Sequence, residues 1–149
     1  MEKYVSKSED QTVEIARSLG SRLKNGGTVA FIGGLGMGKT VFTKGLAKAI
    51  GITADVTSPT FAVVNEYIGE GINLYHFDMY NIDSWESLYS TGFFDYLDTG
   101  NLLAVEWSEN IENALPEKTI FVRIERGIED EERIIYIGGE EVKNESICT

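Results

Sequence analysis

The sequence predicts an α/β protein in which helices cover a mixed β-sheet that is mostly parallel at its centre. Three observations lead to this prediction. The apolar runs at 28–32 and 101–105 are continuous, which is typical of strands buried on both faces of a sheet. Segments with helical periodicity lie between the strand-like runs. Further strand-like runs are joined in pairs by turn residues, which adds antiparallel strands to the sheet.

The first element in chain order is a helix over residues 9–25. Ser8 and Gln11 have the spacing of a capping box at its start. The apolar side chains that recur every four residues on one face are Ile15, Leu19 and Leu23. Glycines after Asn25 end this helix. The buried strand at 28–32 follows, and a second helix spans about 39–50.

The second half of the chain predicts two hairpins, one helix and one further buried strand. The hairpins pair 61–67 with 72–78 and 119–124 with 133–137. Ser84 has the position of an N-cap for a helix over 85–97. The run NLLAV at 101–105 then supplies a second central strand.

Composition and charge are those of one globular domain covering residues 1–149. Hydrophobic residues make up 42% of the chain, but no run approaches the roughly 18 apolar residues of a membrane span, and no secretory signal is visible. The single cysteine, Cys148, excludes an internal disulfide and fits a reducing cytoplasm. The net charge of −11 disfavours direct binding to DNA or RNA, which usually requires a basic face. We therefore expect a cytoplasmic protein without membrane contact.

The stretch GGLGMGKT at 33–40 fits the phosphate-binding pattern G-x-x-x-x-G-K-[ST] in full. The glycines allow backbone N–H groups to point at phosphate oxygens, and the N-terminus of the following helix adds partial positive charge. Lys39 brings a cation to the β- and γ-phosphates, and the Thr40 hydroxyl is a ligand for Mg²⁺. The sequence thus predicts a nucleoside triphosphate site in a three-layer P-loop NTPase-type fold.

A magnesium-dependent site of this kind also needs an acidic residue at the end of a neighbouring strand. Glu106 follows the strand at 101–105, and Asp78 ends the one at 72–78. Either carboxylate is suited to hold Mg²⁺, directly or through water, or to orient an attacking water. The stretch TSPT at 57–60 offers hydroxyls where a switch-like segment would meet the γ-phosphate. The guanine signature Asn-Lys-x-Asp is absent, which disfavours an ordinary GTPase.

The scarcity of histidine and cysteine excludes two other kinds of site. His76 is the only histidine and Cys148 the only cysteine, so neither a histidine-based triad nor a Cys/His zinc site can be assembled. We expect His76, within an apolar strand, to be a satisfied core residue. Trp107 adjoins Glu106 and is placed to move with the metal site.

With these features in order, the chain resembles the TsaE family, small bacterial ATPases of tRNA threonylcarbamoyladenosine biosynthesis. The segments that carry the resemblance are GGLGMGKT at 33–40, SPTFAVVNEY at 58–67, HFDMY at 76–80 and VEWSEN at 105–110. Two positions depart from the family pattern. Met37 stands where the family usually has alanine, and Asn81 where it usually has arginine. The second change removes a cation near the nucleotide, so we expect no phosphate contact from position 81.

The resemblance implies that the chain binds ATP and Mg²⁺ and attaches to a complex of TsaD and TsaB. In that system TsaD transfers the threonylcarbamoyl group to N6 of adenosine 37 of tRNA, and the ATPase resets the complex between turnovers. By position, the resemblance makes Thr40 and Glu106 the metal ligands, and Lys39 and Asp78, with Glu106, the catalytic residues. The positions implied to contact the nucleotide are Thr12, Gly33, Gly36, Met37, Gly38, Lys39, Thr40, Val41 and Arg133.

Two other functions are compatible with the phosphate-binding loop. One is a small kinase, although the chain has no arginine-rich insertion to clamp an acceptor. The other is a nucleotide-sensing binding module whose hydrolysis is incidental. The interpretation that we carry forward is an Mg-dependent ATPase that is weak alone and stimulated by its partners, and that reaches tRNA only through them.

Overall fold

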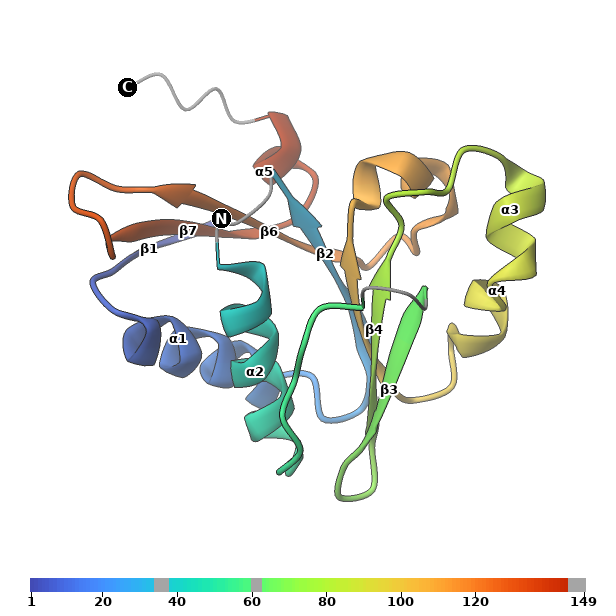
Figure 1. Cartoon of the computed structure of the whole chain (residues 1–149), viewed down its shortest axis with the longest axis horizontal. Helices are drawn as coiled ribbons and strands as arrows, with labels where there is room; N and C mark the ends of the chain where they lie inside the picture. The colour runs from blue at the N-terminus through green and yellow to red at the C-terminus, as the bar shows by residue number, and fades with distance from the viewer. Residues whose placement is uncertain (34–37, 60–62, 145–149) are drawn as a thin grey trace.

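The computed structural model describes residues 1–33, 38–59 and 63–144. Within these residues, seven strands form one sheet in the order β1-β7-β6-β2-β5-β4-β3 (Figure 1). Strand β2 (Gly27–Ile32) is parallel to both of its neighbours, β5 (Leu102–Glu106) and β6 (Ile120–Arg126). Strand β4 (Asn73–Asp78) is parallel to β5. The expected mixed sheet with a parallel centre is therefore confirmed.

The remaining strands are antiparallel and lie toward the two edges. Strand β3 (Val64–Ile68) pairs with β4, and β7 (Arg133–Gly138) pairs with β6, so both predicted hairpins are present. Residues 61 and 62, the start of the first predicted strand, lie outside the described residues. Strand β1 (Glu2–Ser6) pairs with β7 and was not predicted, because only Ser6 in it is buried and the segment has no apolar run.

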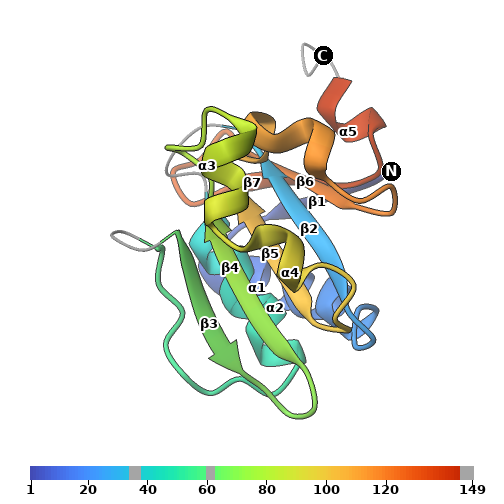
Figure 2. The same cartoon turned by 90° about the vertical axis from the view of Figure 1, so that its right-hand side faces the viewer.

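Helices cover both faces of the sheet and complete three layers. Helices α1 (Glu9–Ser21) and α2 (Lys39–Ala49) lie on one face. Helices α3 (Trp85–Ser90) and α4 (Phe93–Tyr96), with the 3-10 helix η1 (Ser108–Ala114), lie on the other face (Figure 2). A short helix, α5 (Glu141–Asn144), follows β7. None of the helices in the described part of the chain is long and apolar enough to cross a membrane.

A separate apolar layer holds each set of helices to the sheet. Between the sheet and the α1–α2 face, the rings of Phe31 and Phe42 meet edge to face with centroids 5.7 Å apart. On the opposite face, Phe77 and Phe93 make the same kind of contact at 5.3 Å. Each such buried aromatic ring contributes roughly 2–3 kcal/mol through the loss of apolar surface from water. The strand ends are thereby fixed relative to the helices.

Helix α2 is held close to α1 by glycines at the contact. A Cβ at Gly45 would clash with the carbonyl oxygen of Val13 and lie 2.5 Å from the Cβ of Ala16. A Cβ at Gly20 of α1 would lie 2.6 Å from that of Ala49. Because any larger side chain at these positions would separate the helices, the glycines allow α1 and α2 to pack closely.

The first helix is shorter than predicted. The expected span of 9–25 ends at Ser21, and Arg22 is the C-cap. Beyond it the chain turns back toward β2, with a hydrogen bond from the amide of Gly26 to the carbonyl of Leu23 and a positive φ of 100° at Gly26. The N-terminus keeps half of the expected capping box, because Ser8 Oγ accepts from the Gln11 amide at 3.2 Å. The side chain of Gln11 instead accepts from the amide of Lys7.

The helix expected over 85–97 is also different, because it is divided into α3 and α4. Ser84 caps the first of these as predicted, with its hydroxyl accepting from the amide of Ser87. Gly92 then adopts a left-handed conformation with φ 79°, which interrupts the helix. Glycine adopts this conformation at lower energetic cost than residues with a Cβ.

Candidate functional site

The predicted site residues gather where the central parallel strands end. Gly33 directly follows β2, Glu106 is the last residue of β5, and Asp78 is the last residue of β4. The register places Asp78 directly opposite Glu106. After β5 the chain crosses to the other side of β2, where β6 lies. Open α/β sheets bind ligands at such a switch point, outside the carboxyl ends of the strands.

The two ends of the phosphate-binding pattern have the backbone that the pattern requires. Gly33 has φ 112° and Gly38 has φ 98°, both in the region that favours glycine. Gly38 is the N-cap of α2, so the loop leads directly into the helix N-terminus. Gly36 and Met37 lie outside the described residues, and their nucleotide contacts stay predictions.

Lys39 is an unusually buried lysine, with only 5% of its surface exposed. Its Nζ donates a hydrogen bond of 2.7 Å to the carbonyl oxygen of Gly33, across the loop. Burial lowers the pKa of Lys39, and the nearby carboxylates of Glu106, Glu109 and Asp78 act in the opposite direction. A buried cation is costly unless anionic groups surround it, and here such groups come from two strand ends and η1.

Thr40 lies against the segment that was expected to act as a switch. Its Oγ1 is 2.8 Å from Oγ of Ser58, within hydrogen-bonding distance. The described start of this segment is further held by Tyr67, whose hydroxyl accepts from the amide of Thr57 at 3.1 Å. Residues 60–62 lie outside the described residues. The start of the segment is therefore attached both to the α2 N-terminus and to strand β3.

Glu106 is held in the site by a histidine. Oε2 of Glu106 lies 2.6 Å from Nε2 of His76, and the residues are 8% and 0% exposed. His76 is buried as predicted, but one of its two nitrogens contacts the candidate metal ligand. The missed signal is the period-2 spacing of His76 and Asp78, which places both on one face of β4.

Asp78 is more accessible than Glu106 and is held mainly through its backbone. Its side chain is half-buried, and Oδ1 accepts from the amide of Tyr80 at 3.0 Å. Its own amide donates to the carbonyl of Val63 at 2.8 Å. These bonds fix the carboxylate at the turn out of β4 while leaving it open to solvent.

The segment after Glu106 ties the strand ends together. Ser108 Oγ donates to the carbonyl of Phe31 in β2 at 2.8 Å, and Asn110 Nδ2 donates to that of Met79 at 2.8 Å. Trp107 has a left-handed backbone with φ 56°, which costs of order 1 kcal/mol for a bulky residue. Its ring centroid lies 5.6 Å from Lys39 Nζ. The sequence analysis had singled out Trp107 beside Glu106, whereas Ser108 and Asn110 were indicated only through the family resemblance.

A small cavity beside the loop brings together four of the residues expected to contact the nucleotide. It measures about 90 Å³, and among its lining residues are Thr12, Gly38, Val41 and Arg133. Its other walls are Ser8 and three acidic residues, Glu9, Asp130 and Glu131.

Two of those four residues also have structural partners for their side chains. Thr12 Oγ1 lies 2.7 Å from Oγ of Ser6. Arg133 donates to the carbonyls of Asp130 and Glu132, at 2.7 and 2.9 Å. The Arg133 guanidinium therefore holds the β6–β7 turn that forms one wall of the cavity.

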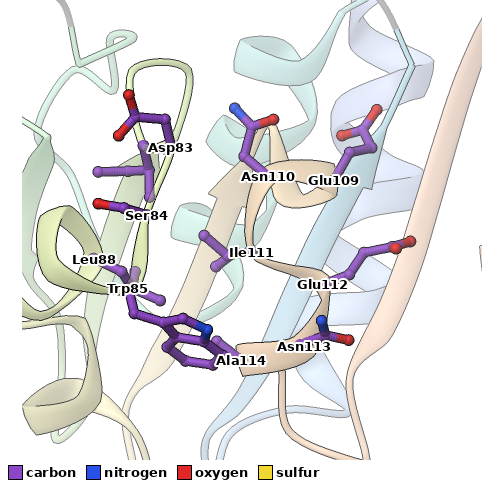
Figure 3. Close-up of a pocket in the computed structure, with 11 residues that line it drawn as sticks. Asp83, Ser84, Trp85, Leu88, Glu109, Asn110, Ile111, Glu112, Asn113 and Ala114 are labelled. Atoms are coloured by element: carbon purple, nitrogen blue, oxygen red, sulfur yellow. The ribbon is translucent and has the colours of Figure 1, made fainter.

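A larger cavity of about 260 Å³ lies apart from these residues, between α3 and η1. Figure 3 shows Trp85 and Asp83 on one side of it and Glu109 and Asn110 on the other. Among the described residues, none of those predicted to bind nucleotide or metal lines it. Glu112, also in its wall, pairs with Lys143 at 3.3 Å.

Comparison with known proteins identifies the family. Residues 6–135 match the family model described as threonylcarbamoyl adenosine biosynthesis protein TsaE. The chain belongs to the TsaE family. It is 36% identical over 135 residues to the TsaE protein of Bacillus subtilis, covering 90% of this chain and 84% of the relative. It is 35% identical over 120 residues to that of Treponema pallidum, covering 80% and 88%.

A solved structure of the family has the same fold. The crystal structure of YdiB from Bacillus subtilis matches with a TM-score of 0.69 and 28% sequence identity. The match covers 96% of this chain and 88% of that chain. The α/β P-loop-type fold expected from the sequence is thus confirmed, as is the resemblance carried by the four sequence segments.

Proposed function

We propose that this chain is an Mg-dependent ATPase of tRNA threonylcarbamoyladenosine biosynthesis that acts on a complex of TsaD and TsaB. Its relatives are named as biosynthesis proteins of that modified nucleoside. The observation that carries the proposal is the meeting of Lys39, Thr40, Asp78 and Glu106 at one edge of the sheet, at the N-terminus of α2.

Phosphate binding in this proposal uses Lys39 and the start of α2. Gly38 brings no side chain to cap the helix, so first-turn N–H groups are left for an anionic ligand. The Lys39 ammonium is already desolvated and bonded to Gly33, so it needs only to exchange a carbonyl oxygen for a phosphate oxygen. The phosphates then supply the anionic partners that a buried ammonium favours.

Thr40 and Glu106 suit a magnesium ion in their chemistry. A hydroxyl and a carboxylate are hard oxygen donors of the kind that Mg²⁺ prefers. Glu106 Oε2 is engaged by His76, which directs the other carboxylate oxygen to the role of ligand. When bound, Mg²⁺ would neutralise charge on the β- and γ-phosphates. Thr40 would exchange its bond to Ser58 for the metal, which couples nucleotide binding to the 57–60 segment.

Asp78 is assigned to the hydrolytic step rather than to nucleotide affinity. Its half-buried carboxylate lies opposite Glu106 in the register and is fixed by the Tyr80 amide. That position suits a group that orients or accepts a proton from an attacking water. Hydrolysis then proceeds through positioning and charge stabilisation, without a covalent intermediate on the protein.

The acidic lining of the small cavity suits the adenosine part of the ligand. Glu9, Asp130 and Glu131 would repel phosphates but can accept hydrogen bonds from an amino group or ribose hydroxyls. Thr12 and Val41 line the same cavity, next to Gly38 at the start of α2. A net charge of −11 further agrees with a protein that reaches tRNA only through its protein partners.

Release of inorganic phosphate from Mg-ATP tests this proposal, measured for the protein alone and then with the TsaD–TsaB pair. We expect slow release alone, stimulation by the pair, and loss of both in Lys39→Ala. Lys44→Ala is the matched control, because Lys44 lies in the same helix and is exposed. A rate that the pair leaves unchanged would contradict the partner role. Phosphate appearing on an added acceptor would instead indicate a kinase.

A further inference from the structure

The only histidine in the chain, His76, contacts the candidate metal ligand Glu106. His76 is on β4 and Glu106 on the neighbouring strand β5, thirty residues later in the sequence. The residue directly opposite His76 in the register is Ala104. Its small side chain leaves room for the imidazole to lie across β5 and reach the carboxylate two residues further on, at 2.6 Å.

The surroundings of His76 are otherwise apolar. Leu74 and Ala104 lie on the same face of the sheet and belong to the core beneath α1 and α2. An apolar side chain at position 76 would extend that core and save the cost of burying a polar ring. Among the described residues, the hydrogen bond to Glu106 is the polar contact of the imidazole. Any advantage of histidine over an apolar residue at position 76 therefore comes from that contact.

The contact with Glu106 shows which ring nitrogen of His76 carries a hydrogen. Among the described residues, His76 Nδ1 is the one buried side-chain nitrogen or oxygen without a hydrogen-bond partner. An unpaired Nδ1 costs about 1–3 kcal/mol whether or not it carries a hydrogen, so it does not decide the tautomer. An ionised carboxylate only accepts hydrogen bonds, so Nε2 carries a hydrogen and donates it to Glu106 Oε2.

We propose that His76 is a positioning residue, which holds Oε2 of Glu106 by an Nε2–H donor so that the other carboxylate oxygen faces the metal. This inference rests on the proposed role of Glu106 as a magnesium ligand. A hydrogen bond fixes the rotation of the carboxylate, which would otherwise turn freely about its terminal bond. Residues that orient a ligand in this way typically change metal affinity by 10–100-fold when removed.

The first measurement is a nitrogen-15 spectrum of the imidazole, which is unambiguous because the chain has one histidine. We expect Nε2 to have the shift of a protonated nitrogen and Nδ1 that of an unprotonated one, both with and without a magnesium–ATP analogue. In Glu106→Gln the Nε2 signal should move. A ring protonated on Nδ1 instead, or one insensitive to Glu106→Gln, would overturn the proposal.

The second measurement is calorimetric affinity for a non-hydrolysable ATP analogue, with and without Mg²⁺. His76→Phe keeps an aromatic ring but removes the donor, whereas His76→Gln keeps a donor near the position of Nε2. We expect the gain in affinity from Mg²⁺ to fall by about 10-fold or more in His76→Phe and to be largely retained in His76→Gln. Affinity for the analogue without Mg²⁺ should be the same in the wild type and in both His76 variants.

Leu74→Val controls for general damage to the strand, because Leu74 lies on the same face of β4 and is fully buried. It should leave the magnesium gain unchanged. A folded His76→Phe protein that keeps the full gain would overturn the positioning role while leaving the proposed function intact. A wild-type protein with no magnesium gain would overturn both. If His76→Phe does not fold, the imidazole spectrum of the wild-type protein decides.

Discussion

Cavities lie at both ends of the parallel strands β2 and β5, but different kinds of side chain line them. At the amino ends a cavity of about 420 Å³ lies against Gly27, Asn101 and Thr119. At the carboxyl end, the small cavity beside the start of α2 measures about 90 Å³. A further cavity of about 410 Å³ lies against Trp107, just beyond the end of β5, and one of about 700 Å³ lies against Gly51, after α2. Size therefore does not distinguish the two ends.

The difference lies in how the charged groups are placed. At the carboxyl end, the ammonium of Lys39 is buried near the carboxylates of Glu106 and Asp78. At the amino end, the charged residues in the cavity wall are Asp98 and Lys118, both exposed. Converging charges that are expensive to bury mark a functional site better than the size of a hollow. The strand direction agrees, since parallel sheets bind ligands at their carboxyl ends.

Of the substitutions that compare the two ends, Glu106→Gln at the carboxyl end should change phosphate release most. It keeps the side-chain shape but removes the charge proposed to hold Mg²⁺. We expect phosphate release to fall by about a thousandfold, which corresponds to roughly 4 kcal/mol. Phosphate release by the TsaD–TsaB-stimulated protein measures it, with circular dichroism as the check on folding. A loss smaller than about tenfold would remove Glu106 from the metal site.

Asp78→Asn should have the next largest effect, about a hundredfold on hydrolysis, because it removes the group assigned to the attacking water. Nucleotide affinity should change by less than about threefold, since Asp78 is not assigned to binding. Single-turnover hydrolysis and calorimetry separate the two quantities. If affinity falls as much as the rate, Asp78 belongs to the binding site instead.

At the amino end, Asn101→Ala should affect stability but not activity. Oδ1 of Asn101 accepts from the amide of Asn73 at 2.9 Å, where β4 begins. Losing this bond should cost about 1 kcal/mol, or about 4 °C in Tm, by thermal melting. Lys118→Ala, on the same rim, is the control and should change neither quantity. A large loss of phosphate release in either variant would mean that the amino end takes part in function.

The parts of the fold that the sequence predicted are those with strong local signals. The continuous apolar runs identified β2 and β5, and turn residues identified both hairpins. Strand β1 has no such signal, because it is an edge strand with mostly exposed side chains whose pairing to β7 comes from backbone bonds. The break at Gly92 was also missed, since the apolar residues on both sides continue a helical pattern.

The features of the site that the sequence did not predict are contacts between residues far apart in the chain. The pattern at 33–40 and the acids at 78 and 106 could be singled out because each lies at the end of a strand. The contact between His76 and Glu106 depends on the register of β4 against β5, which no local pattern specifies. The same holds for Ser108, whose bond to Phe31 joins residues 77 positions apart.

The central claim is that the carboxyl end of the sheet, and not the cavity at the amino end, binds the magnesium nucleotide. Amide shifts in a nitrogen-15 spectrum, recorded while a non-hydrolysable ATP analogue and Mg²⁺ are added, test it most directly. We predict large changes at Gly33, at residues 38–41 and at Glu106, with residues 25–28 and 118–120 unchanged. Changes confined to residues 25–28 and 118–120 would contradict the claim.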